Sequence, residues 1–343
     1  MKKVRVLIVD DSFVIRNILK QSLEHDPDIE VVGTACDAFE ARDMIIQLRP
    51  DIMTLDIEMP RMNGLDFLKK LMPQYPMPVI VVSSLDDRVF DALEAGAVDF
   101  IHKPGGLTRT QLVEHMKFEL NEKVKAVVKA KITGRKRREP TVVITDGITG
   151  RADKDIIVMG ASTGGTEAVY DIISKFDTDI PGVVVVQHMP PGFTGMFAER
   201  MDNQCHVTVK EAKDGDRVKH GQVLIAPGDK HTRLLKSKDG YHLECKFGER
   251  VGGHCPSVDV LFRSVAEVAK DKAVGVILTG MGSDGAEGLM EMHHQGAVTL
   301  GQDEVSSVIY GMPKVAFEMG AVTYQVGLSK MAGKIYSVLN NKR

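Results

Sequence analysis

Residues 160–164 place a serine where a nucleophile is expected. They read Gly-Ala-Ser-Thr-Gly, which fits the G-x-S-x-G pattern, and they follow an apolar run at 156–159. In this pattern the serine stands on a tight turn from a strand into a helix, and small neighbours leave room beside its oxygen. Ser162 is therefore a candidate nucleophile that needs a base.

A histidine and an aspartate occupy similar positions further along the chain. His188 follows the apolar run 183–186, and Asp284 follows the run 274–278 through a glycine-rich turn. If these runs are buried parallel strands, their carboxyl ends share one edge with Ser162. Because a base activates a serine and a carboxylate orients an imidazole, the three residues suggest a hydrolytic triad.

Each of these residues also has a structural interpretation. A lone histidine usually has a surface or hydrogen-bonded role, and Asp284 would also suit the N-cap of a helix at 285–294, in addition to a catalytic role. The glycines around Asp284 would expose backbone N–H groups, as an oxyanion hole requires. The rival interpretation of residues 160–165 is a phosphate cradle, which is disfavoured because G-x-G-x-x-G and a following acid are missing.

A second group of reactive side chains lies in the first half of the chain. Asp10 and Asp11 end one apolar run, Asp56 ends another, and Ser83 and Lys103 end two more. Neighbouring carboxylates repel one another unless a cation or a proton intervenes, and oxygen ligands suit Mg²⁺. The pattern predicts a site for a phosphoryl group, which an aspartate can accept.

Alternating strands and helices must position this second group. The apolar pattern predicts strands near 4–9, 30–34, 52–55, 78–82 and 98–101, and helices near 13–25, 38–48, 63–72, 86–95 and 107–121. We expect Asp11 or Ser12 to cap the first helix. The alternation predicts a flavodoxin-like domain over 1–121, with a five-stranded parallel sheet in the order 2-1-3-4-5. The first and third strands are neighbours in that order, so their aspartates would meet.

The triad candidates require a second α/β domain, predicted over 153–343. Its expected strands lie near 156–160, 183–188, 223–226, 274–279 and 297–300, and its expected helices near 166–175, 192–202, 258–271, 284–294 and 328–340. Short alternating runs at 207–247 suggest a small hairpin. We expect a doubly wound domain with a mainly parallel sheet.

Residues 122–152 separate the two predicted domains. Their first part is rich in Lys and Arg, and Pro140, Gly147 and Gly150 follow. We interpret the segment as a basic solvated linker whose start continues the preceding helix. The alternative is a nucleic-acid-binding arm at 135–138, but no interleaved aromatic residue or helix-turn-helix pattern accompanies it.

Composition limits the remaining classes. A chain of 343 residues with a net charge of −3 suggests two globular domains and gives no general attraction to nucleic acid or membranes. No apolar run reaches the length of a membrane span, and the apolar stretch at 4–9 is too short for a signal peptide. The four scattered cysteines, Cys36, Cys205, Cys245 and Cys255, argue against a zinc site or a disulfide framework and fit the cytoplasm.

The motifs of the first half together resemble the receiver domain of two-component response regulators. They are Val-Leu-Ile-Val-Asp-Asp-Ser at 6–12, Leu-Asp-Ile-Glu-Met-Pro at 55–60, Asn-Gly at 63–64, Ser83, Gly-Ala at 96–97 and Lys-Pro at 103–104. The resemblance implies that Asp56 accepts phosphate from a histidine kinase. Asp11, Asp56 and the backbone carbonyl of Glu58 would ligate Mg²⁺, and Asp10 would act through water or as a second carboxylate.

The same resemblance assigns the remaining residues of the phosphorylation site. Lys103 would bind the phosphate, and Ser83 with Phe100 would form the switch pair. Ser84 is the alternative hydroxyl.

The second half resembles the catalytic domain of CheB-type protein-glutamate methylesterases of bacterial chemotaxis. The matching segments are Gly-Ala-Ser-Thr-Gly-Gly at 160–165, Gln-His-Met-Pro at 187–190, Pro-Ser-Val-Asp-Val-Leu-Phe at 256–262, Thr-Gly-Met-Gly-Ser-Asp-Gly at 279–285 and Tyr-Gly-Met-Pro at 310–313. The resemblance implies that Ser162 attacks, that His188 is general base and acid, and that Asp284 orients it. The N–H of Met281 would help to hold the oxyanion.

This resemblance also implies a substrate and partners. The substrate would be glutamate 5-O-methyl ester on chemoreceptors, with deamidation of selected glutamines as a second reaction and no cofactor for ester hydrolysis. The partners would be the receptors and a chemotaxis histidine kinase, with contact to the membrane only through the receptors. We expect a cytoplasmic monomer in which phosphorylation relieves inhibition by the receiver. A DNA-binding regulator and a receiver-gated scaffold without catalysis are the competing hypotheses.

Overall fold

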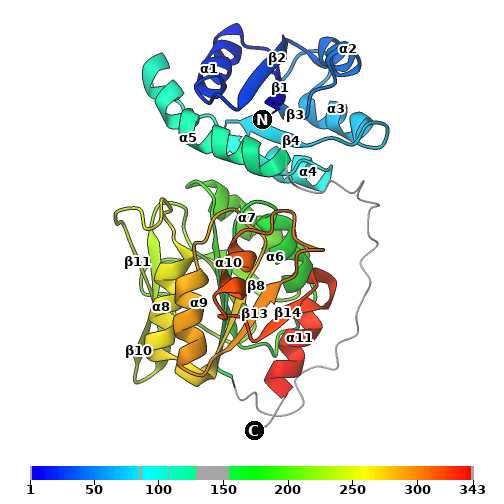
Figure 1. Cartoon of the computed structure of the whole chain (residues 1–343). Coiled ribbons are helices and arrows are strands. Elements are labelled where there is room, and N and C mark those ends of the chain that lie inside the picture. The colour runs from blue at the N-terminus through cyan, green and yellow to red at the C-terminus, as the bar shows by residue number, and fades with distance from the viewer. Residues whose placement is uncertain (1, 85–86, 107, 129–153, 341–343) are drawn as a thin grey trace. The chain divides into compact units, whose positions relative to one another are not determined.

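The computed structural model describes residues 2–84, 87–106, 108–128 and 154–340. These residues form two compact units, one before and one after residues 129–153 (Figure 1). Residues 129–152 of the predicted linker, with the alternative nucleic-acid arm at 135–138, lie outside the described residues. No helix within the described ranges is both long and apolar enough to cross a membrane.

The first unit is built on a five-stranded parallel sheet. Its strands are β1 (Val4–Val9), β2 (Ile29–Ala35), β3 (Ile52–Leu55), β4 (Val79–Ser83) and β5 (Asp99–His102), in the order β2-β1-β3-β4-β5. All four residues of β3 and all five of β4 are buried. Continuous apolar runs are typical of parallel strands with both faces covered. The observed order β2-β1-β3-β4-β5 confirms the predicted strand order.

Within the described ranges of this unit, five helices cover the sheet. They are α1 (Phe13–Leu23), α2 (Ala38–Leu48), α3 (Gly64–Leu71), α4 (Arg88–Glu94) and α5 (Arg109–Val128). Ser12 caps α1 by accepting a hydrogen bond from the backbone N–H of Ile15, so Ser12 rather than Asp11 is the cap. Helix α5 continues seven residues beyond the predicted end at 121, into the start of the predicted linker.

The second unit is built on a seven-stranded parallel sheet. Its strands are β6 (Ile156–Ala161), β7 (Gly182–Gln187), β8 (Thr208–Glu211), β9 (Gln222–Ile225), β12 (Ala273–Ile277), β13 (Val298–Gln302) and β14 (Tyr324–Val326), in the order β14-β13-β12-β6-β7-β9-β8. Strands β10 (His231–Ser237) and β11 (Gly240–Lys246) form an antiparallel hairpin. The hairpin expected within 207–247 is confirmed, whereas β8 and β14 were not predicted.

The helices of the second unit connect its strands in two opposite directions along the sheet. They are α6 (Gly165–Ile173), α7 (Phe193–Gln204), α8 (Val258–Val268), α9 (Ala286–His294), α10 (Met312–Glu318) and α11 (Leu328–Asn340), with a short 3₁₀ turn at Lys270–Lys272. Helix α6 leads from β6 to β7, whereas α9 leads from β12 to β13 in the opposite direction along the sheet. Since such crossovers are right-handed, α6 and α9 cover opposite faces, as the doubly wound prediction requires (Figure 1).

The reversal of direction marks where a ligand site is expected. In open parallel sheets a crevice forms at the carboxyl ends of the strands where the winding direction changes. That point lies between β6 and β12 in the second unit, and between β1 and β3 in the first. The candidate nucleophile follows β6, Asp284 follows β12, and the aspartates of the first unit follow β1 and β3.

Candidate functional site

Strand register places Ser162 and His188 next to each other. Ala161 of β6 pairs with Gln187 of β7, and each strand ends there, so Ser162 and His188 are the following residues. The backbone N–H of His188 donates to the carbonyl of Ala161 at 3.0 Å. The predicted strand ended at His188, whereas β7 ends one residue earlier, so His188 is the first residue after the strand.

The turn that carries Ser162 is closely packed. The N–H of Ser162 donates to the carbonyl of Thr279 at 3.0 Å, which ties the turn to the segment after β12. Gly164 has a φ of +75°, which favours glycine. A Cβ at Gly280 would lie 2.7 Å from the Ser162 Cβ. Glycine at positions 164 and 280 therefore allows the Ser162 turn and the segment after β12 to pack closely against each other.

Asp284 is held by four hydrogen bonds. Its carboxylate accepts from His188 Nε2 at 2.8 Å, from Ser257 Oγ at 2.7 Å, and from the backbone N–H groups of Val258 at 2.7 Å and Asp259 at 3.1 Å. The last two are the first amides of α8, where the helix dipole also favours an anion. Asp284 therefore caps α8 from another loop, whereas α9 begins after Gly285 without a side-chain cap.

These contacts set the charge of the carboxylate. Burial by itself raises the pKa of Asp284, but the hydrogen bonds from His188, Ser257 and Val258 outweigh it and lower the pKa to about 2. The side chain is only 2% exposed. An ionised carboxylate beside the imidazole can fix its tautomer and stabilise an imidazolium.

The imidazole of His188 presents one free nitrogen. Nε2 faces Asp284, whereas Nδ1 is buried and has no hydrogen-bond partner within the described ranges. Because the carboxylate only accepts, Nε2 carries the proton and Nδ1 is left as a base. A second ring lies flat against the first, since the ring centroids of His188 and His254 are 3.8 Å apart with an interplanar angle of 9°.

A catalytic triad has two hydrogen bonds, one between the serine hydroxyl and the imidazole and one between the imidazole and the carboxylate. The second is present between His188 and Asp284, whereas no hydrogen bond joins Ser162 Oγ to His188 among the described residues. In free enzymes such bonds are often long and tighten only when substrate binds. The arrangement brings the three predicted residues to one sheet edge, which is the geometry that acyl transfer uses.

Met281 lies in the turn between β12 and Asp284, two residues after Thr279, the residue that accepts from the Ser162 N–H. Its backbone N–H donates to no other residue in the parts of the chain that the structure describes. An unused amide beside the nucleophile suits the stabilisation of an oxyanion. The predicted role of Met281 stays a prediction.

Sequence reasoning missed His254 and Ser257. His254 was one of eleven histidines, with no strand end to single it out. Ser257 lies within the segment 256–262, but only the fold shows that its hydroxyl reaches Asp284. Both residues come from the stretch before α8, which the sheet pattern does not place.

The carboxylates of the first unit also meet at one sheet edge. Carboxylate oxygens of Asp10, Asp11 and Asp56 lie within 4.8 Å of one another. Lys103 Nζ lies 2.6 Å from Asp10 Oδ2 and 2.8 Å from Asp56 Oδ2, so its charge offsets the two buried carboxylates. Burial raises the pKa of Asp56, and the charge of Lys103 partly opposes this effect.

The donor set fits a magnesium ion. Three carboxylates gather at one point, and Asp11 is exposed to solvent while Asp10 and Asp56 are buried. Hard cations such as Mg²⁺ bind carboxylate and carbonyl oxygens together with water. Asp11, Asp56 and the carbonyl of Glu58 are therefore suitable ligands, with Asp10 beside them.

Of the predicted switch residues, Ser83 ends β4, whereas Phe100 lies within β5, two residues before the end of that strand. Ser83 is fully buried, and its Oγ has no hydrogen-bond partner in the described ranges, whereas Ser84 is exposed. Phe100 is 4% exposed and packs edge-on against Phe90 with ring centroids 6.5 Å apart. The structure thus shows a buried, unsatisfied hydroxyl at the end of β4 and an aromatic side chain in the interior, and the switch role of both residues stays a prediction.

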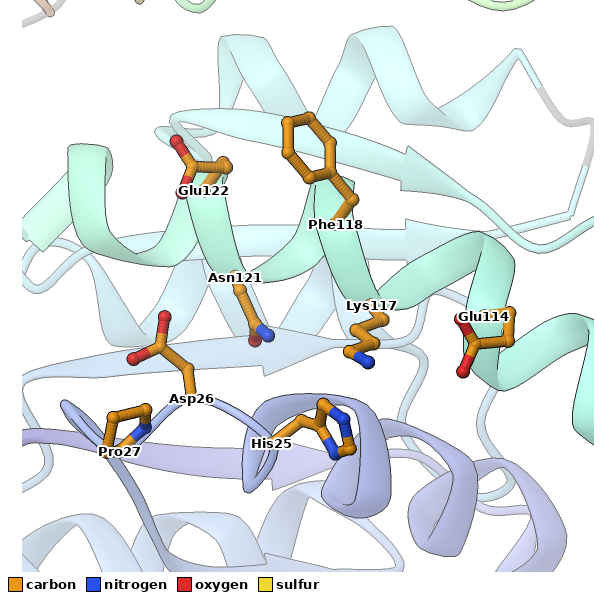
Figure 2. A pocket seen from close by; sticks show the side chains of 8 residues that line it. All are labelled: His25, Asp26, Pro27, Glu114, Lys117, Phe118, Asn121 and Glu122. Atoms are coloured by element: carbon orange, nitrogen blue, oxygen red, sulfur yellow. The ribbon is translucent and has the colours of Figure 1, made fainter.

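A pocket of about 400 Å³ lies in the first unit away from these sites (Figure 2). Figure 2 shows it between the segment before β2 and helix α5, with side chains from His25, Asp26, Pro27, Glu114, Lys117, Phe118, Asn121 and Glu122. This segment precedes β2, so the pocket lies near the amino ends of the strands. It contains none of the predicted site residues.

Comparisons with known proteins agree over both units. A family model described as CheB methylesterase matches residues 157–335, and one described as response regulator receiver domain matches residues 6–117. A protein-glutamate methylesterase/protein-glutamine glutaminase 2 of Syntrophomonas wolfei is 52% identical over 340 residues and covers 99% of each chain. A relative from Caulobacter vibrioides, named protein-glutamate methylesterase/protein-glutamine glutaminase 1, is 48% identical over 350 residues and covers 100% of each chain.

A solved structure is similar to the second unit. The CheB methylesterase catalytic domain of Thermotoga maritima is 38% identical, with a TM-score of 0.53. The match covers 54% of this chain and 98% of that chain.

Proposed function

Because the chain belongs to the CheB methylesterase family and has a receiver domain ahead of the catalytic unit, we propose that it is a phosphorylation-regulated protein-glutamate methylesterase. It hydrolyses glutamate 5-O-methyl esters on chemoreceptors to glutamate and methanol. It also deamidates selected receptor glutamines, as the names of its relatives suggest. Its role is adaptation in chemotaxis.

One observation carries the catalytic assignment. His188 Nε2 is bonded to a buried carboxylate with a pKa of about 2, while Nδ1 is unpartnered beside the turn of Ser162. An imidazole held in this way can take a proton from a hydroxyl. Ser162, His188 and Asp284 are therefore assigned as nucleophile, base and orienting carboxylate.

The reaction proceeds through an acyl-enzyme. Nδ1 of His188 takes the Ser162 proton as the oxygen attacks the ester carbonyl carbon, and the oxyanion accepts from the N–H of Met281. The tetrahedral intermediate collapses, the C–O bond to methoxide breaks, and His188 returns the proton to give methanol. Water then attacks in the same way, which releases the glutamate carboxylate and restores Ser162. One oxyanion donor typically lowers the barrier by about 2.7–4 kcal/mol.

The first unit supplies regulation. Asp56 accepts a phosphoryl group from the chemotaxis histidine kinase, Lys103 binds the phosphate, and Ser83 with Phe100 responds to it. Bound Mg²⁺, held by Asp11, Asp56 and the carbonyl of Glu58 with Asp10 nearby, would neutralise charge on the transferring phosphoryl group.

The phosphate adds about −1.5 to −2 charges at the receiver's sheet edge. It favours a receiver conformation that inhibits the catalytic unit less. The protein works as a cytoplasmic monomer that contacts the membrane only through the receptors. Four free cysteines support a reducing compartment.

Release of methanol from methylated receptor membranes tests this proposal. Wild-type protein should release methanol, Ser162→Ala should not, and Ser174→Ala at the other end of α6 serves as the matched control. Loss of methanol release in the control, or its survival in Ser162→Ala, would reject the assignment. Salt-dependent, sequence-selective binding to duplex DNA would instead favour the DNA-binding hypothesis.

A further inference from the structure

The side chain of Gln187 lies between the two reacting residues. Gln187 ends β7 and is 3% exposed. Its Nε2 donates to the carbonyl of Ser162 at 3.0 Å and to the carbonyl of His188 at 3.3 Å. One amide group thus bonds to the backbone of the nucleophile and to the backbone of the base.

The neighbouring turn is shaped to receive this amide. A Cβ at Gly165 would lie 2.2 Å from Gln187 Oε1, so a side chain at position 165 is incompatible with the present place of the amide. Gln187 Oε1 is buried without a hydrogen-bond partner among the described residues. An unsatisfied buried acceptor is costly, which argues that the amide is retained for what its N–H groups do.

The position of the backbone matters here because of which ring nitrogen is free. Nδ1 is bonded to the ring carbon that joins the Cβ, so it lies close to the main chain of His188. Displacing the residue 188 backbone therefore moves Nδ1 almost directly. A hydrogen bond to the His188 carbonyl that shares its donor with the Ser162 carbonyl limits this displacement.

We infer that Gln187 is a positioning residue for acyl transfer: its amide fixes the Ser162 turn relative to the end of β7, so that the hydroxyl and Nδ1 stay within reach of each other. This inference rests on the proposed function of Ser162 and His188. Gln187 does not touch the reacting atoms, so it acts on the rate and not on substrate binding. Misplacing reactive groups by about 1 Å costs on the order of a hundredfold in rate.

The test replaces the amide without removing its bulk. Gln187→Met keeps a similar shape and loses both donors, and Gln187→Glu keeps the shape and presents an acceptor to the two carbonyls. The first measurement is the rate at which a fluorophosphonate labels Ser162, which needs an activated serine and no receptor. The second is kcat and KM for methanol release from receptor membranes.

Thr299→Val is the matched control. Thr299 is a fully buried polar residue of β13, and its hydroxyl bonds to the hydroxyl and accepts from the backbone N–H of Thr323, not of Ser162 or His188. We expect both Gln187 variants to label and turn over about ten- to a hundredfold more slowly than wild type with KM within twofold. Thr299→Val should lose comparable thermal stability with a smaller change in labelling rate.

Several outcomes would overturn the inference. They are a folded Gln187 variant that labels within twofold of wild type, a loss confined to KM, and a Thr299→Val variant that slows labelling equally. If neither Gln187 variant folds, the side-chain N–H signals of Gln187 in the wild-type protein decide. Slow exchange with solvent and a shift on phosphonylation of Ser162 support the bridge, whereas exchange as fast as that of an exposed glutamine rejects it. Wild-type protein that labels but releases no methanol would reject the methylesterase proposal alone.

Discussion

At the scale of single residues, Asp284 contributes both to the candidate catalytic site and to the stability of the fold. Its carboxylate bonds to the His188 imidazole and also accepts hydrogen bonds from two backbone N–H groups at the start of α8. The sequence predicted both a capping role and a catalytic role for this residue, but it assigned the cap to α9 and not to α8. A loop residue can cap any helix whose amino end folds against it, so neighbours in sequence are an incomplete guide.

Asp284→Asn should weaken the acid dependence of stability. The pKa of Asp284 is about 2 in the folded protein against an ordinary 3.8. A pKa lowered by folding gives stability that is complete above 3.8 and is lost as the pH falls through about 2. The shift corresponds to about 2 kcal/mol. Urea unfolding at several pH values should show the gap between wild type and variant closing over this range, and a constant gap would contradict the prediction.

The ring stack predicts a graded effect at His254. His254→Ala removes the ring that lies 3.8 Å from His188, whereas His254→Phe retains a flat ring. We expect the alanine variant to lose about two- to tenfold in kcat, since an aromatic pair contributes about 0.5–1.5 kcal/mol, and the phenylalanine variant to recover most of it. His242→Ala, in the hairpin, is the control. Equal losses in both His254 variants would show that stacking is not the reason.

Residue types at strand ends were predictable, and their partners were not. Ser162, His188, Asp284 and Asp56 stand out because an apolar run precedes each of them. Ring orientation at His188 depends on Asp284, which binds the amino end of α8, and on His254 in the loop before α8, and no local pattern encodes those contacts.

At the scale of elements, the first turn of α8 is wedged against the strand ends. Val258 begins α8 and is fully buried. A Cβ at Gly160, two residues before Ser162, would lie 2.2 Å from its Cγ1, and one at Gly285 would lie 2.4 Å from the same atom. Glycine at both positions therefore lets α8 approach the sheet closely enough for its amides to reach Asp284.

Gly160→Ala should destabilise the second unit by overpacking. The expected loss is about 1–3 kcal/mol in the free energy of unfolding. Adding Val258→Ala should recover part of it, because the methyl groups that the new Cβ meets are removed. Denaturant unfolding of the single and double variants measures the coupling. Gly333→Ala, in α11 with no atom near its Cβ, is the control and should stabilise the protein. An additive double variant would contradict this account.

Short elements escaped the sequence pattern for physical reasons. β14 has three residues of which two are exposed, and β8 has one buried residue, so neither shows an apolar run. α10 has seven residues, which is less than two helical turns and too short to show an apolar face in the sequence. Long buried strands such as β7 were predicted to within one residue because four consecutive valines leave little choice.

At the scale of the whole chain, both sites obey one topological rule. Each lies where the winding of a parallel sheet reverses, between β1 and β3 in the first unit and between β6 and β12 in the second. Fold class and site position were therefore predictable together from alternating strands and helices.

Phosphorylation should raise the esterase rate. With acetyl phosphate and Mg²⁺, we expect methanol release by the wild-type protein to increase about 5- to 150-fold, the range that a coupling of about 1–3 kcal/mol allows. Asp56→Asn should keep the resting rate and lose the response. An unchanged rate in phosphorylated wild type, or a response that survives in Asp56→Asn, would reject the regulatory model.

The reach of Asp284 into α8 also bears on attempts to move this chemistry elsewhere. Transplanting the hydroxyl, the imidazole and the carboxylate into a foreign scaffold would leave the carboxylate without the two backbone N–H groups that donate to it. A faithful graft has to bring the amino end of a helix with it, aimed at the same oxygen atoms.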